Sequence, residues 1–273
     1  MPREDILRSS RQRRRKRSIL KLSFFLLGIF LFLGAVVGFF YIPKFRISEI
    51  SVEGANILDN EQLKEEIAGW LKGKFFKIFP YDNIFLLPKV KITASLLQKF
   101  PVLKKISFTR DFSRKLFVLV GERKAEALWC LDRTSTSTDS GDDSCAFVDE
   151  DGFIFQPAPS FSGRIFLKFF DEREKTSDIG EEMISASEFQ KLLSFKEFLN
   201  QNNMEVSQIV LKDNGEYEVN LKEGWHILLN SKNEPNLSFN NLKLILDSNV
   251  KEKRPRLEYV DLRFGNKVFY KLK

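Results

Sequence analysis

Few side chains in this sequence have the types and spacing that chemistry at a site requires. Two cysteines, Cys130 and Cys145, flank a polar stretch rich in Ser, Thr, Asp and Gly, which predicts a loop between two strands. In paired strands the two thiols would lie across a hairpin, and an oxidising compartment would permit a disulfide. Two buried free thiols are the alternative. A zinc site is not expected, because two cysteines and the distant His226 do not complete a tetrahedral ligand set.

The sequence predicts no catalytic residues. Its single histidine, His226, lies in an apolar run that predicts a strand, and acid–base catalysis requires a partner within reach. The acidic residues Asp149, Glu150 and Asp151 fall at a predicted turn, and the pair at 142–143 falls in a loop, where carboxylates are normally solvated. Neither a Gly-rich phosphate loop nor a nucleophile elbow is present. We therefore expect a non-enzymatic protein with no cofactor, no metal and no small-molecule substrate.

An apolar run near the N-terminus predicts a membrane span. Residues 22–42, LSFFLLGIFLFLGAVVGFFYI, carry no charge and, as a helix, would cross a hydrocarbon core of about 30 Å. Residues 1–42 hold nine basic and two acidic side chains, a net charge of +7 that equals the net charge of the whole chain. A basic tail beside an apolar run favours a membrane protein over a nucleic-acid binder, whose charge lies on the folded domain. The positive-inside rule places residues 1–21 in the cytoplasm and residues 43–273 outside.

A cleaved signal peptide is the alternative to an anchor. Its apolar region would span about 7–15 residues and would end in small residues at a cleavage site. The run in this chain is longer and ends in Phe-Phe-Tyr-Ile before Pro43, which favours an uncleaved helix in the lipid bilayer.

Residues 43–123 are expected to form a first folded domain. Alternation in FRISEISVEG predicts a strand over residues 45–54, and a capping-box pattern at 59–62 precedes apolar residues at helical spacing. The remaining elements are a helix over 90–100 and two strands, 104–110 and 114–122, forming a hairpin around Asp111, Phe112 and Ser113. This order of strand, helix, helix, strand, strand resembles a polypeptide-transport-associated (POTRA) domain.

Residues 124–273 are expected to form a second domain rich in β-structure. Asp151-Gly152 within FVDEDGFIF predicts a hairpin, and RIFLKFF predicts a further strand. A capping box at 185–188 predicts a helix, and three short alternating runs, VSQIVLK, EYEVNL and WHILLN, predict an antiparallel meander. A second helix is expected to begin at Ser238. The sequence ends in a predicted hairpin, LEYVDLRFGNKVFYKLK, interrupted by Gly265-Asn266.

Nearly the whole chain resembles the FtsQ/DivIB family of bacterial cell-division proteins. Four motifs carry the resemblance in the family's order: FRISEISVEG, ERKAEALW, FVDEDGFIF and YVDLRF. The resemblance implies an α+β protein with a basic cytoplasmic tail (1–21), a single transmembrane helix (22–42), a POTRA domain (43–123) and a mainly antiparallel β domain with two helices (124–273). It also implies a scaffold of the division complex in the plasma (inner) membrane, located at the septum.

The resemblance further implies a protein-binding surface at the C-terminal hairpin. An edge strand presents unpaired N–H and C=O groups that can pair with another chain. In the family, the strand near the C-terminus pairs with a partner of the FtsB/DivIC type, alongside an FtsL-type protein. Carried onto this chain, the partner-binding residues are Tyr259, Phe264, Lys267, Val268, Phe269 and Tyr270. The alternative is that the hairpin only closes the sheet.

Two other classes of function remain as alternatives. POTRA domains also guide unfolded chains in transport or secretion systems, although that function requires a barrel partner, and this sequence lacks the series of amphipathic strands that a barrel needs. A membrane-anchored cell-wall enzyme would require a pocket with perturbed titratable groups, which only a structure reveals.

Overall fold

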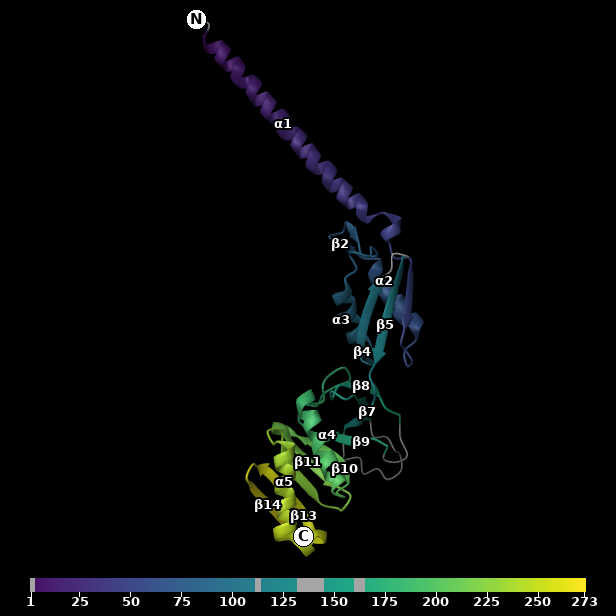
Figure 1. Ribbon diagram of the computed structural model, residues 1–273, viewed down its shortest axis with the longest axis vertical. Helices are drawn as coiled ribbons and strands as arrows, with labels where there is room; N and C mark the ends of the chain where they lie inside the picture. The colour runs from purple at the N-terminus through teal and green to yellow at the C-terminus, as the bar shows by residue number, and fades with distance from the viewer. Residues whose placement is uncertain (1–2, 111–113, 132–144, 160–164) are drawn as a thin grey trace. The chain divides into compact units, whose positions relative to one another are not determined.

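The computed structural model describes residues 3–110, 114–131, 145–159 and 165–273 (Figure 1). The turn predicted at 111–113 and most of the loop between the two cysteines, including Asp142 and Asp143, lie outside the described residues. The chain divides into two compact units. The first comprises residues 1–96 and 105–121, and the second comprises residues 97–104 and 122–273.

A single long helix, α1 (Arg3–Phe40), begins the first unit. Its segment Ser18–Phe40 is long and apolar enough to cross a membrane and is not buried within the protein. The helix ends two residues earlier than the span expected from sequence. Ile42 precedes Pro43 and is extended, with φ −61° and ψ 123°, because a following proline disfavours the helical conformation.

The rest of the first unit combines a small sheet with two helices. Its elements are a 3₁₀ turn (Pro43–Phe45), β1 (Glu49–Glu53), α2 (Asn60–Leu71), β2 (Lys74–Phe75), β3 (Phe79–Pro80), α3 (Lys89–Lys99), β4 (Leu103–Arg110) and β5 (Lys115–Glu122). Strand β5 lies between β1 and β4, and it runs parallel to β1. A short hairpin, β2–β3, lies between the two helices, in a segment for which the sequence predicted neither a helix nor a strand.

The second unit is built on a nine-stranded sheet. Its strands are β6 (Ala127–Leu131), β7 (Cys145–Val148), β8 (Ile154–Pro157), β9 (Leu167–Asp171), β10 (Val206–Lys212), β11 (Glu216–Leu221), β12 (His226–Asn230), β13 (Leu257–Phe264) and β14 (Lys267–Leu272). Their order across the sheet is β14-β13-β12-β11-β10-β9-β6-β7-β8. Three pairs are parallel, β6–β9, β9–β10 and β12–β13, and the others are antiparallel. The predicted α+β class, with one N-terminal apolar helix and a mostly antiparallel sheet, is confirmed.

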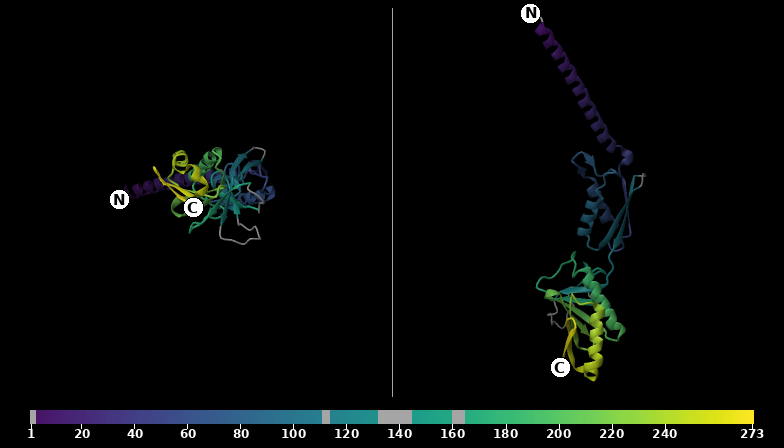
Figure 2. Two further views of the ribbon diagram at one scale, coloured as in Figure 1. Left: turned by 90° about the horizontal axis from the view of Figure 1, so that it is seen from below. Right: turned by 60° about the vertical axis from the view of Figure 1, so that its left-hand side comes forward.

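Two helices, α4 (Ala186–Gln201) and α5 (Pro235–Ile245), lie side by side on one face of this sheet (Figures 1 and 2). Helix α4 begins with the predicted capping box, in which Ser185 and Glu188 satisfy each other's backbone N–H groups. Helix α5 begins at Pro235, three residues before the predicted Ser238, because proline suits the first turn of a helix. After α5, a π-helical turn (Leu246–Val250) and a 3₁₀ turn (Lys251–Arg256) lead into β13.

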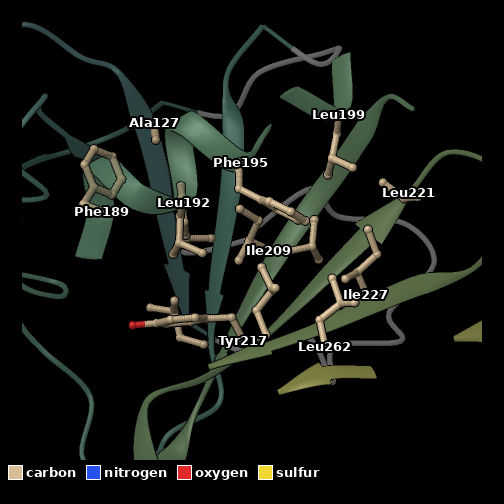
Figure 3. Packing of buried hydrophobic residues seen from close by; sticks show 14 of the residues in the cluster. Ala127, Phe189, Leu192, Phe195, Leu199, Ile209, Tyr217, Leu221, Ile227 and Leu262 are labelled. Atoms are coloured by element: carbon tan, nitrogen blue, oxygen red, sulfur yellow. The ribbon is translucent and has the colours of Figure 1, made fainter. Parts of the chain in front are cut away.

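The core of the second unit lies between these helices and the sheet. Figure 3 shows Phe189, Leu192, Phe195 and Leu199 of α4 above side chains from the strands. All four are buried, as their helical spacing predicts. This core continues to the last strands, where Val260 and Leu262 of β13 are buried and residues of β14 pack against it. The C-terminal hairpin is therefore an integral part of the sheet.

Candidate functional site: the C-terminal edge of the sheet

The hairpin β13–β14 forms one edge of the nine-stranded sheet. Strand β14 is the outermost strand in the sheet order, paired only with β13 among the strands that the structure describes. Gly265 stands in the turn with φ +63°, a conformation that glycine adopts readily. The side-chain amide of Asn241 on α5 donates a hydrogen bond of 3.0 Å to the Gly265 carbonyl. The fold thus holds the turn in place and leaves one side of β14 unpaired.

The two faces of β14 differ in chemistry. Val268, Tyr270 and Leu272 pack against the core beneath the helices, whereas Lys267, Phe269 and Lys271 are exposed. Residues directly opposite each other in a ladder share a face. The register pairs Tyr259 with Lys271 and Phe264 with Lys267. Of the six residues that the sequence nominated for partner binding, Tyr259, Phe264, Lys267 and Phe269 therefore share the open face, and Val268 and Tyr270 face the core.

The unpaired side of β14 offers backbone groups in a regular order. The N–H of Lys273 donates to the carbonyl of Arg256 at 2.7 Å, so it points toward β13. In an antiparallel ladder the direction of these groups alternates along the strand. The N–H and C=O groups of Val268, Tyr270 and Leu272 consequently point to the free edge. An added strand could hydrogen-bond there without disturbing the β13–β14 pairing.

An exposed aromatic pair marks the end of the hairpin next to the turn. The rings of Phe264 and Phe269 lie edge to face, and their exposed fractions are 57% and 53%. Buried aromatic pairs are common in protein cores, but this one is open to solvent. Exposed aromatic residues of this kind are the anchors that dominate many protein–protein interfaces.

The charged residues Arg263 and Lys271, near the Phe264–Phe269 pair, already form ion pairs within the protein. Arg263 donates to both oxygens of the buried Asp261 and to Glu216, at 2.5 to 3.0 Å, and these bonds raise the pKa of Arg263. Lys271 pairs with Glu258 at 2.8 Å, which raises the pKa of the lysine. Sequence reasoning missed the contact between Arg263 and Glu216, because the two residues are 47 positions apart in the chain.

His226 and Tyr259 form a second aromatic contact on the same face. The register places them opposite each other on β12 and β13, and their rings stack with centroids 5.6 Å apart. Tyr259 is only partly exposed and lies one strand inside the edge. His226 therefore packs against Tyr259, and Tyr259 lies at the inner border of the open face.

At the other end of the sheet, Cys130 and Cys145 are joined by a disulfide. The two residues lie directly opposite each other on β6 and β7, with Cα atoms 4.1 Å apart. Cys130 is fully buried and packs with Leu128, Phe170 and Val210. The bond therefore closes the segment between β6 and β7 at its base.

The acidic turn at 149–151 is only partly solvated, contrary to expectation. Glu150 and Asp151 are exposed and pair with Lys104 at 2.6 Å. Asp149, in contrast, is buried, forms an ion pair with Arg123 at 2.6 Å and accepts the N–H groups of Asp151 and Phe153. The burial of Asp149 was missed because the sequence analysis treated all three carboxylates as solvated. An Asp in a turn can instead accept hydrogen bonds from the backbone N–H groups that follow it.

A second buried ionisable cluster, around Asp171, also has a structural role. Asp171 accepts hydrogen bonds from the Trp129 indole at 3.0 Å and from Arg173 at 2.6 and 2.7 Å. Burial alone would raise the pKa of Asp171, but Arg173 and Trp129 outweigh it and lower that pKa. Arg173 also donates to the Met183 carbonyl at 2.9 Å. These bonds tie the segment after β9 to the sheet.

Comparisons with known proteins do not identify a family. No family model matches the chain, and a search of curated proteins found no match. Within the described residues, no group of three or more His, Cys, Asp and Glu side chains is placed to hold a metal ion. The open edge and the aromatic pair of the C-terminal hairpin are the features on which a function can be built.

Proposed function

We propose that this chain is a non-enzymatic, single-pass membrane scaffold of the bacterial division complex, of the FtsQ/DivIB type. The apolar segment Ser18–Phe40 supports anchoring in the plasma membrane. The eight basic residues that precede this segment, together with Lys21 near its start, favour a cytoplasmic N-terminus and extracytoplasmic folded units. The order β1, α2, α3, β4, β5 in the first unit supports a POTRA-like domain, with the β2–β3 hairpin as an addition.

One observation carries the proposal: strand β14 leaves a regular backbone edge open beside the exposed rings of Phe264 and Phe269. Binding by strand addition uses backbone hydrogen bonds for affinity and alternate side chains for specificity. The free edge of β14 supplies the backbone hydrogen bonds, and the open face supplies the side chains that give specificity. The partner we propose is a segment of an FtsB/DivIC-type protein, assembled with an FtsL-type protein.

The lysines on the open edge strand suit a scaffold that binds one partner selectively. Edge strands that have no partner risk nonspecific pairing, and lysines on the strand are a common protection. Lys267 and Lys271 stand on β14, and they discourage pairing with strands that do not offer matching acidic or aromatic groups. The proposed role is therefore selective binding of one extended segment rather than general aggregation.

Imaging of dividing cells tests the proposal. A fluorescent protein fused to the cytoplasmic N-terminus is expected to form a ring at the division site, and depletion of the protein is expected to block septation. A uniform membrane signal that persists through septation would overturn the division role. In that case a POTRA-bearing transport protein becomes the next function to examine.

A further inference from the structure

The short hairpin β2–β3 is fixed to the end of the apolar helix. The Tyr41 hydroxyl donates to the carbonyl of Ile78 at 2.5 Å, and the ring of Phe40 meets that of Phe79 edge to face at 5.5 Å. The fully buried Asn83 donates to the Phe40 carbonyl at 3.0 Å. These contacts place the hairpin beside the C-terminal end of the apolar segment of α1.

The tip of this hairpin has unusual residues for its backbone shape. Phe76 and Lys77 both have positive φ, 48° and 61°. Phe76 and Lys77 are the central residues of a turn closed by the hydrogen bond from the Ile78 N–H to the Phe75 carbonyl. Turns with positive φ at both central residues strongly prefer Asn and Gly, because a side chain at positive φ is sterically disfavoured. An aromatic and a basic residue at these positions do not favour the turn. Their presence at these positions points to a role for the two side chains outside the turn itself.

The side chains at the tip are apolar and exposed. Phe76 is 76% exposed, the highest value for an aromatic residue in the described part of the chain, and Phe75 and Ile78 are 45% and 48% exposed. The rings of Phe75 and Phe76 lie against each other, with centroids 4.3 Å apart. An exposed apolar cluster of this kind marks a surface that contacts a partner or a membrane.

Basic residues surround the apolar tip. Lys74 and Lys77 are exposed within the hairpin, and Lys72 precedes it. A surface hollow of about 370 Å³ at the base of the hairpin is lined by Lys72 and Lys74 together with Tyr41. Aromatic rings with lysines beside them are the combination found at the boundary between lipid headgroups and acyl chains, where the rings enter and the ammonium groups reach the phosphates.

We infer that the β2–β3 hairpin is a second membrane contact, which inserts Phe75 and Phe76 into the headgroup region of the bilayer that α1 crosses. Lys74 and Lys77 would bind lipid phosphates. A lipid surface is favoured over a protein because Tyr41 bonds the hairpin to the end of the apolar helix, where Phe39 and Tyr41 are themselves exposed. The inference rests on the membrane-anchoring part of the proposed function and not on the division role.

Such a contact would restrain the first unit at the membrane. Residues 41 and 42 alone separate the helix from the 3₁₀ turn, so one span would act as a single point of attachment. A second point at the hairpin would prevent rotation about that attachment. The first unit would then keep a fixed orientation relative to the membrane surface.

Tryptophan fluorescence of the full chain in vesicles tests the inference. The vesicles contain phosphatidylethanolamine with a minor fraction of phosphatidylglycerol, and flotation establishes that the protein is inserted. Phe76→Trp places an indole at the tip, and Leu119→Trp, on the exposed face of β5, is the matched control. The signal of the three native tryptophans is subtracted by measuring the unsubstituted protein in parallel.

The indole introduced by Phe76→Trp is expected to be quenched severalfold more by lipids brominated near the headgroup than the indole of Leu119→Trp. It is also expected to be protected from iodide. Lys74→Gln combined with Lys77→Gln should weaken this quenching when phosphatidylglycerol is present. Because the double lysine variant leaves both rings and the core intact, it reports on lipid contact rather than on folding.

Two results would overturn the inference, and they have different meanings. If the protein floats with the vesicles but the Phe76→Trp indole remains open to iodide and unquenched by brominated lipid, the hairpin does not touch the bilayer. The proposed anchor and division role would survive that result. If the protein does not float, the membrane-anchoring part of the proposed function fails together with the inference.

Discussion

The rings of Phe264 and Phe269 meet edge to face across the last turn of the sheet, with centroids 5.6 Å apart and planes at 90°. Phe264 ends β13 and Phe269 stands on β14, so the pair joins the two strands on the face opposite the helices. More than half of each side chain is exposed. Edge-to-face pairs contribute about 0.5–1.5 kcal/mol beyond area burial, so this pair is pre-arranged before any partner binds.

Replacing Phe269 by alanine should weaken partner binding without unfolding the protein. Central aromatic anchors typically cost about 2 kcal/mol or more when truncated, which is roughly a 30-fold loss of affinity. Because Phe269 is 53% exposed and outside the core, the melting temperature of the protein should fall by only a few degrees, through loss of the contact with Phe264. Titration of the purified full chain with an FtsB/DivIC-type partner measures the affinity. Leu244→Ala, which truncates an exposed side chain on α5, is the control and should bind normally.

A proline on β14 should distinguish backbone pairing from side-chain contact. The N–H of Val268 points to the free edge, so Val268→Pro removes a donor from the proposed interface while the β13–β14 ladder keeps its bonds. Val268→Ala loses the same packing against the core but keeps the N–H. We expect Val268→Pro to bind the partner at least about tenfold more weakly than Val268→Ala, the equivalent of one hydrogen bond. Equal affinities would exclude strand addition as the mode of binding.

The disulfide should make a measurable contribution to stability. Cys130 and Cys145 are separated by 15 positions, and closing a loop of this size contributes about 3 kcal/mol by restricting the unfolded chain. Urea unfolding with and without a reductant is expected to show a lower midpoint for the reduced protein. The midpoint of the variant with both Cys130→Ala and Cys145→Ala should be insensitive to the reductant. If reduction does not shift the midpoint of the unsubstituted protein, the bond is not formed in solution.

Local patterns allowed much of the second unit to be predicted. The alternating runs at 206–212, 216–221 and 226–230 form the antiparallel meander β10–β11–β12, and the capping box at Ser185 begins α4 as expected. The parallel pairs β6–β9, β9–β10 and β12–β13 could not be predicted in this way. Parallel neighbours are joined by long connections, so no local pattern in the sequence records which strands meet.

Local sequence patterns also left details of the hairpins β13–β14 and β2–β3 unpredicted. Gly265-Asn266 signals the turn between β13 and β14, but the run Val268-Phe269-Tyr270 is apolar throughout, so alternation does not reveal which residues face the core. The hairpin β2–β3 was missed altogether. Its tip carries Phe76 and Lys77 in place of the Asn and Gly that normally identify such a turn.

Acid should remove the stabilising effect of Asp171. Burial opposes its ionisation, but Arg173 and Trp129 together lower its pKa below the ordinary value. A depressed pKa stabilises the fold above the unfolded-state value of about 3.9, and this stabilisation is lost as pH falls below that value through the folded-state pKa. Asp171→Asn should therefore destabilise the protein by about 2–3 kcal/mol at pH 7, less than for a fully buried pair because Arg173 is partly exposed.

The pH dependence of this difference is the decisive measurement. Denaturant unfolding at a series of pH values should show the stabilities of the unsubstituted protein and Asp171→Asn converging below about pH 4. A difference that stays constant from pH 7 to the acid limit would mean that the carboxylate charge does not contribute. Lys271→Gln is a suitable control, because its pair with Glu258 is exposed and solvent screens the attraction between exposed charges.

Gly54 should tolerate substitution far less than Gly121, although Gly121 belongs to β5 and Gly54 lies against the same strand. Gly54 follows β1 with φ +92°, and a Cβ there would lie 2.2 Å from the Val120 carbonyl oxygen. At Gly121 a Cβ would meet nothing closer than Lys105 at 3.7 Å. Gly54→Ala is therefore expected to destabilise the first unit by about 2–4 kcal/mol, since it combines backbone strain with a clash. Gly121→Ala should be neutral or stabilising by up to about 1 kcal/mol, because alanine restricts the unfolded chain.

Limited proteolysis locates the effect of these two substitutions. Opening of the first unit by Gly54→Ala should expose cleavage sites in residues 45–121 at protease concentrations that leave the second unit intact, because the two units have separate cores. Gly121→Ala should be cleaved no faster than the unsubstituted protein. If Gly54→Ala resists protease as well as Gly121→Ala does, the chain after β1 can move away from Val120. The close approach of Gly54, at the end of the FRISEISVEG motif, to the Val120 carbonyl would then not be required for folding.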